Sequence, residues 1–174
     1  MQGWMIGVYA MLAAGAAQAE EVYATAGSWV ISAEPPSHRC VMHRSYRSKD
    51  GKKNEGLAVV YAADKEGVLL FWSNDWMTYL RSTGDLELGL AFKKGTSVDE
   101  SWGSRTLHYD KVDNNYHFAR AFTDADESRR ILRDLAVNET MGISLGPVLI
   151  TKLPLDASEA VDKLRECSLQ GGTH

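Results

Sequence analysis

The stretch LAVVYAADKEGVLLFWS (residues 57–73) contains two apolar runs separated by a short polar segment. The runs, 57–63 and 68–73, are rich in valine, leucine and aromatic residues, which favour strands. The segment between them, DKEG, has the composition of a turn. Two strands joined by so short a connection pair in antiparallel orientation, so the stretch predicts a β-hairpin at the centre of the chain.

Strand patterns continue on both sides of this hairpin. An Asp-Gly pair at 50–51 is a strong hairpin signal, and alternating leucines in 85–94 indicate a half-buried strand. A turn at 113–115 divides the next run. The predicted strand regions are 27–32, 38–46, 57–63, 68–73, 85–94 and 105–122. The middle of the chain is therefore predicted to be an antiparallel meander.

The last third changes to a helical period. Thr123 or Asp124 can cap a helix whose apolar stripe includes Ile131, Leu132 and Leu135. A strand-like run at 146–155 follows. A final helix is expected after it, with Asp156 and Glu159 as a capping box and Cys167 on the inward face. The predicted fold class is α+β, an antiparallel β-sheet meander with two helices in the C-terminal third packed on one face.

The beginning of the chain resembles an export signal. Residues 1–19 carry no charged side chain and end in Ala17-Gln18-Ala19, the small-residue pattern that signal peptidase accepts. The apolar part is too short for a membrane span. We expect a signal peptide at 1–19, a single globular domain at 20–174, a periplasmic or secreted location, and no transmembrane span after cleavage. With 19 basic and 23 acidic residues, the net charge of −4 argues against a nucleic-acid partner.

Two cysteines permit only one intramolecular pair. Exported proteins fold where thiols oxidise, so we predict a disulfide between Cys40 and Cys167, with two separate thiols as the alternative. Such a bond would fasten the last helix to an early strand.

Two motifs raise the question of chemistry. His38, Cys40, Met42 and His43 bring potential copper or zinc ligands together, but strand alternation separates His43, and a disulfide would consume the thiolate. GISLG (142–146) matches Gly-x-Ser-x-Gly around Ser144, a motif that acts between a strand and a helix with Asp and His following. Here a strand-like run follows. We therefore expect no metal, no other cofactor and no catalytic residue.

Binding is the better expectation. Six cations lie within fifteen residues, 39–53, of an otherwise acidic chain, and paired tryptophans follow in 71–80. The residues expected to contact a partner are Arg44, Arg47, Lys52, Lys53, Trp72 and Trp76. A solvated hairpin and core tryptophans are the structural alternatives. The partner would be an envelope protein or another anionic surface, such as a lipid headgroup or a polysaccharide.

The two ends of the chain carry a family resemblance. GSW (27–29), the cysteine at 40 and the closing LPLDASEAVDKLREC (153–167) resemble small periplasmic proteins of alphaproteobacteria, including the invasion associated locus B type. That family often has a cysteine two or three residues after the tryptophan, where this chain has Ser32. The resemblance implies an envelope-associated protein and carries no catalytic residues over to this chain.

The sequence therefore favours an exported, non-enzymatic envelope protein that binds a macromolecular partner. The alternative is an inhibitor of an exported hydrolase such as lysozyme, whose basic surface would suit the acidic net charge. A weak hydrolase acting through Ser144 is the third hypothesis.

Overall fold

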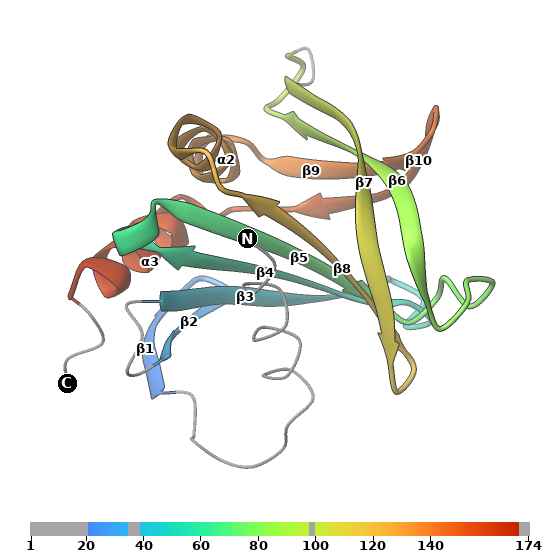
Figure 1. Cartoon of the computed structure of the whole chain (residues 1–174), viewed down its shortest axis with the longest axis horizontal. Helices are drawn as coiled ribbons and strands as arrows, with labels where there is room; N and C mark the ends of the chain where they lie inside the picture. The colour runs from blue at the N-terminus through green and yellow to red at the C-terminus, as the bar shows by residue number, and fades with distance from the viewer. Residues whose placement is uncertain (1–20, 35–38, 98–99, 171–174) are drawn as a thin grey trace.

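The structure is a computed structural model that describes residues 21–34, 39–97 and 100–170 (Figure 1). Ten strands in these residues form one sheet: β1 (Glu21–Ala26), β2 (Trp29–Glu34), β3 (Arg39–Arg47), β4 (Asn54–Ala62), β5 (Gly67–Asn74), β6 (Thr83–Lys93), β7 (Glu100–Val112), β8 (Asn115–Phe122), β9 (Thr140–Leu145) and β10 (Val148–Pro154). The helices are the short 3-10 helix η1 (Ala63–Lys65) and the α-helices α2 (Ala125–Val137) and α3 (Ser158–Gln170). The predicted signal segment and His38 lie outside the described residues.

The central hairpin forms as predicted. β4 and β5 pair in antiparallel register from Glu55 opposite Asn74 to Ala62 opposite Gly67. The connection is η1 followed by Glu66, which adopts a left-handed conformation with φ of 46°. Val59 and Leu70 lie opposite each other and are buried. The predicted α+β class is confirmed, because all pairings are antiparallel and both α-helices lie in the C-terminal third.

The strand order departs from a simple meander at two junctions, β5–β8 and β6–β9. The order across the sheet is β1-β2-β3-β4-β5-β8-β7-β6-β9-β10, so the strand beside β5 is β8 rather than β6. Most of β5 is buried, including both Phe71 on one face and Trp72 on the other. Its second edge is covered by β8, which returns there after the β6–β7 hairpin, with Trp72 opposite Phe118.

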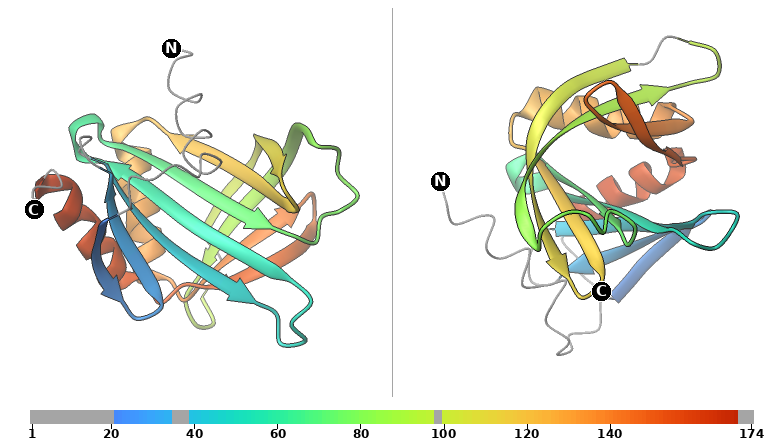
Figure 2. Two further views of the ribbon diagram at one scale, coloured as in Figure 1. Left: turned by 90° about the horizontal axis from the view of Figure 1, so that it is seen from below. Right: turned by 90° about the vertical axis from the view of Figure 1, so that its right-hand side faces the viewer.

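The sheet curves strongly, so its last strands return above its first half (Figure 2). β6 pairs with β7 along most of its length, but pairs with β9 only from Gly89 to Lys93. The register between β6 and β7 shifts between Gly89 and Ala91, and such irregularities bend a strand. A Cβ at Gly89 would lie 2.5 Å from the Ser144 hydroxyl oxygen, so a larger residue there would require the Ser144 side chain to move.

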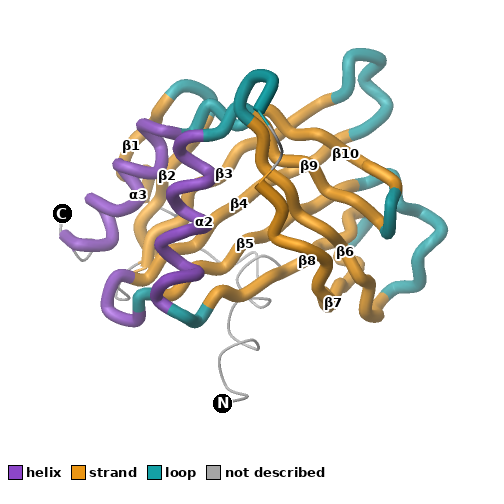
Figure 3. Tube along the Cα trace, turned by 90° about the horizontal axis from the view of Figure 1, so that it is seen from above, coloured by secondary structure: helices purple, strands orange, loops and turns teal. Residues whose placement is uncertain are grey.

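The helices occupy the concave side of the sheet (Figure 3). Asp124 caps α2, as predicted, by accepting hydrogen bonds from the backbone N–H groups of Asp126 and Glu127. The expected stripe of α2 is buried, and α3 buries four apolar side chains. Those of α3 are Ala160, Val161, Leu164 and Cys167. The apolar core of the described residues includes these helix side chains and side chains from the inner face of the curved sheet.

The predicted disulfide is confirmed. Cys40 of β3 and Cys167 near the end of α3 are bonded, with 6.1 Å between their Cα atoms and 127 positions between them in the sequence. Both side chains are buried. The bond attaches the C-terminal helix to the inner face of β3.

Two local expectations need correction. Asp156 does not cap the final helix, because α3 begins at Ser158 and Asp156 has a positive φ of 47°, whereas N-cap residues are usually extended. The strand expected at 146–155 is the second half of a hairpin. β9 ends at Leu145, Gly146 adopts a left-handed φ of 57°, and β10 starts at Val148.

Candidate functional site

A cleft of about 470 Å³ between the β3–β4 hairpin and β10 is a candidate site. We call it the basic cleft. It is lined by Arg44, Ser45, Tyr46, Arg47, Ser48, Lys53, Glu55, Ile150, Thr151, Lys152, Leu153 and Pro154. One wall comes from the cationic hairpin noted in the sequence, and the other comes from a strand about a hundred residues later. The curvature of the sheet creates the site.

The charge of the cleft is strongly positive. Two arginines and two lysines line it, and the only carboxylate among the described residues of the lining is that of Glu55. Arg44 donates from Nη1 to the Leu155 carbonyl oxygen at 2.8 Å, and its guanidinium lies 4.9 Å from the centre of the Tyr46 ring. Arg47 and Lys152 are exposed. In a protein of net charge −4, this concentration of cations favours an anionic ligand.

Glu55 joins the two walls. Thr151 donates its hydroxyl to the Glu55 carboxylate, with 3.0 Å to Oε1 and 2.9 Å to Oε2. The indole of Trp76 donates to Oε1 at 3.0 Å, and the indole of Trp72 donates to Oε2 at 3.3 Å. These bonds hold the carboxylate within the protein, so the charge facing an incoming ligand comes mainly from the cations.

Tyr46 contributes an unused hydroxyl. Its oxygen is buried and has no hydrogen-bond partner among the described residues. Burial raises the pKa of Tyr46 to about 12, with Glu55 adding to the rise and the positive charge of Arg44 opposing it. The hydroxyl therefore stays protonated at neutral pH and can donate a hydrogen bond.

The predicted contact residues separate into three groups. Arg44, Arg47 and Lys53 line the basic cleft. Lys52 does not line it and lies exposed in the β3–β4 turn, where its backbone N–H donates to Asp50. The two tryptophans described next form the third group.

The two tryptophans do not present a stacking surface. Trp72 is 3% exposed and stacks on Phe118 with 5.0 Å between ring centres, so it belongs to the core. Trp76 is partly buried beneath Lys53, whose ammonium nitrogen lies 4.6 Å from its ring centre. The expectation that Trp72 contacts a partner is therefore wrong for this structure, and the core alternative holds for it.

No sequence pattern indicated the residues that join the two walls of the cleft. Glu55, Thr151 and Lys152 belong to the site, yet Glu55 and Thr151 are 96 positions apart. A threonine and a lysine in a strand-like run carry no signal of their own. Only the return of β10 above the β3–β4 hairpin brings them to the cationic wall.

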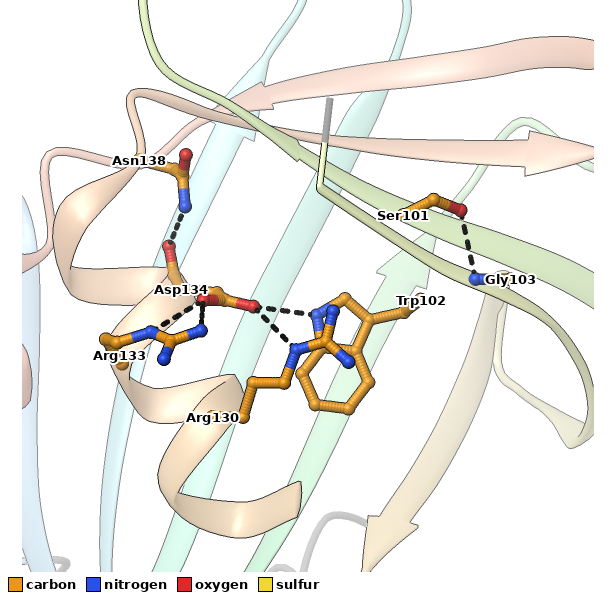
Figure 4. Close-up of polar contacts among 7 residues, drawn as sticks. All are labelled: Ser101, Trp102, Gly103, Arg130, Arg133, Asp134 and Asn138. Carbon is orange, nitrogen blue, oxygen red and sulfur yellow. Dashed lines mark hydrogen bonds and ion pairs between the residues drawn. The ribbon is translucent and has the colours of Figure 1, made fainter. Parts of the chain in front are cut away.

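A buried carboxylate lies elsewhere, on α2. Asp134 is 0% exposed and accepts a hydrogen bond from the Trp102 indole at 3.0 Å (Figure 4). Arg133 contacts its other oxygen at 3.0 Å, and Arg130 Nε lies 3.7 Å away while its guanidinium stacks over Trp102 at 4.2 Å. Every polar atom of this carboxylate is engaged by the protein itself. The cluster therefore fastens α2 to β7 and offers no free group for a ligand.

A buried arginine, Arg120, lies on the inner face of β8. Arg120 is 9% exposed, and its Nη1 has no hydrogen-bond acceptor among the described residues. The guanidinium lies 4.7 Å from the Phe122 ring centre and 5.7 Å from that of Trp102. Burial lowers the pKa of Arg120, and the positive charge of Arg105 lowers it further.

An Asp-His-Thr arrangement occurs on the surface. His108 Nδ1 lies 3.0 Å from Asp85, and its Nε2 lies 3.4 Å from the Thr83 hydroxyl. Asp85 is 67% exposed, whereas the aspartate of a serine-protease triad is buried. Asp110 also approaches Nε2 at 3.5 Å and competes with the hydroxyl. The arrangement is a solvated polar cluster.

The chemistry considered from the sequence has no support in the geometry. Ser144 lies within β9, whose turn leads to another strand, whereas the nucleophile motif needs a strand followed by a helix. The Cys40 sulfur is bonded to Cys167, and His43 is exposed on the face opposite Met42. In the described part of the chain, no group of three or more His, Cys, Asp or Glu side chains is placed to hold a metal ion.

Among the described helices, none has the length and apolar character needed to cross a membrane. Comparison of the chain with family models, with curated proteins and with solved structures gave no match.

Proposed function

We propose that this is an exported, non-enzymatic protein that binds a macromolecular partner through anionic groups of that partner held in the basic cleft. The observation that carries the proposal is the charge of the cleft, four cations against one carboxylate that the protein already engages. Electrostatic attraction of this kind speeds encounter and selects partners by charge.

Export is supported by the disulfide and by the beginning of the sequence. Structural disulfides persist mainly in oxidising compartments such as the periplasm or the exterior of the cell. The pattern at 1–19 is that of a signal peptide. N-terminal sequencing of the protein recovered from the periplasm or medium is expected to begin at Glu20. Recovery of the chain only from the cytosol, with two free thiols, would contradict export.

The binding proposal is tested with two variants of equal charge change. Arg47→Gln/Lys152→Gln removes one exposed cation from each wall, and Lys49→Gln/Lys52→Gln removes two exposed cations outside the cleft. Immobilised protein is incubated with envelope extract, and each captured component is quantified. We expect the first variant to capture about tenfold less of the specific partner than the unmodified protein does. The second variant should capture the same amount as the unmodified protein. Equal capture by both variants would refute the proposal.

Salt dependence and a lysozyme assay complete the test. Raising the ionic strength screens exposed charges, so capture should fall with added salt. Slowed lysis of bacterial cells by lysozyme in the presence of the protein would instead support the inhibitor hypothesis, because lysozyme is basic and would avoid a basic cleft.

A further inference from the structure

The basic cleft is bounded by two strand segments whose outer edges are unpaired within the described residues. β10 is the last strand of the sheet and pairs only with β9. β3 pairs with β2 as far as His43, opposite Val30, so its residues 44–47 extend beyond β2. An unpaired strand edge presents a row of backbone N–H and C=O groups that can accept another strand.

Both edges open into the cleft. Its lining consists largely of two unbroken runs, 44–48 and 150–154. Successive side chains of a strand point to opposite faces, so a cleft on one face would collect every second residue. Unbroken runs indicate instead that the cleft follows the edges of β3 and β10.

The walls are held apart by side chains. Thr151 reaches Glu55, and Arg44 reaches the Leu155 carbonyl oxygen. Paired strands lie about 4.8 Å apart and bond backbone to backbone, whereas these walls are joined through side chains and are therefore further apart.

The charges and side chains along the two walls indicate the composition of the segment that would bind there. Exposed Arg47 and Lys152 stand on opposite walls, and the apolar side chains of Val148 and Leu149 are exposed at the beginning of β10. Pro154 has no N–H, and the register of β10 shifts at Ile150, so regular pairing is confined to 151–153, about 10 Å of strand. A short extended segment with acidic side chains matches the charge of the walls and the length of the regular strand, and exposed Val148 and Leu149 lie beside this stretch, outside the residues that line the cleft.

We propose that the anionic partner is a protein and that an extended acidic segment of it enters the basic cleft and pairs with the free edge of β10, an inference that rests on the proposed function. Main-chain hydrogen bonds supply affinity in this mode of recognition, and side chains on alternate positions supply selectivity. Carboxylates of the segment meet Arg47 and Lys152, the exposed cations of the two walls.

The probe is the amidated octapeptide (Glu-Val)4, labelled with fluorescein on its N-terminal amine through an aminohexanoyl spacer and titrated with the oxidised protein by fluorescence anisotropy. The matched ligand is the same peptide N-methylated on every residue, which removes the N–H groups of both strand edges in any register without changing its charge. We expect the methylated peptide to bind about tenfold more weakly. Arg47→Gln/Lys152→Gln should weaken binding of the unmodified peptide by about tenfold, and Lys49→Gln/Lys52→Gln should leave it unchanged.

The outcomes separate this inference from the proposed function. Equal binding of the two peptides, or binding of neither, overturns strand pairing. A heparin oligosaccharide and vesicles containing phosphatidylglycerol are then titrated with the same variants. If Arg47→Gln/Lys152→Gln weakens binding of the oligosaccharide or the vesicles and Lys49→Gln/Lys52→Gln does not, the proposed function stands with a polysaccharide or a lipid as the partner. No effect of the cleft cations on any of the four probes overturns both.

Discussion

Replacing Asp134 by alanine should lower the free energy of unfolding, because its buried carboxylate accepts a hydrogen bond and forms two ion pairs. Asp134→Ala removes the acceptor of the Trp102 indole N–H, and this buried donor then lacks a partner. An unsatisfied buried donor costs about 1–3 kcal/mol. The ion pairs to Arg130 and Arg133 add less, about 0–1 kcal/mol each, because the arginine side chains are 44% and 57% exposed. Alanine's better helix propensity returns about 0.5 kcal/mol. We expect a net loss of about 2–3 kcal/mol.

Asp134→Asn is the matched variant. Its amide oxygen can still accept from Trp102, so it should lose only the charge contribution, about 1 kcal/mol. Asn138, which donates to the backbone carbonyl of residue 134, is unaffected by either change. The difference between the two variants therefore measures the buried hydrogen bond.

The assay is urea unfolding of the oxidised protein followed by far-UV circular dichroism, which does not depend on tryptophan emission. With a slope of about 1–3 kcal/mol/M, the loss of about 2–3 kcal/mol in Asp134→Ala shifts the midpoint to lower urea by about 0.7–3 M. A double-mutant cycle with Trp102→Phe should give a coupling energy of about 1–2 kcal/mol. Equal stabilities of the Ala and Asn variants, or additive effects in the cycle, would refute the assignment of the stabilisation to this hydrogen bond.

Three further predictions concern the disulfide, a tyrosine and a buried arginine. Cys40→Ser/Cys167→Ser releases a 127-residue loop and should lower the unfolding free energy by up to about 4.9 kcal/mol; unchanged urea unfolding would contradict this. Folding raises the pKa of Tyr46 from 10.0 to about 12, so its contribution to stability is complete below pH 10 and is lost between pH 10 and 12. Tyr46→Phe should show a smaller fall in stability over that range, and equal falls would contradict the assignment. Arg120→Met removes a buried cation with an unpaired Nη1 and should raise the unfolding free energy by about 1–3 kcal/mol; a loss would show that the aromatic rings compensate the charge.

The candidate site was predictable only in part. The cations at 44, 47 and 53 form a cluster along the chain, so the sequence indicates one wall of the basic cleft. The position of Lys52 outside the cleft depends on the shape of the β3–β4 turn, and the burial of Trp72 depends on β8 lying beside β5. A run of aromatic residues looks the same in sequence whether its rings face a partner or a core.

The sequence by itself determined most of the antiparallel strands, the two C-terminal helices, a cap at Thr123 or Asp124, and the pairing of Cys40 with Cys167. These features follow from short-range periodicity, from local hydrogen bonding and from the presence of only two cysteines. Only the tertiary structure decided the placement of β8 beside β5 and the return of β10 to the β3–β4 hairpin. The curvature that produces this return accumulates from twist, register shifts and packing over the whole sheet, so no local stretch encodes it.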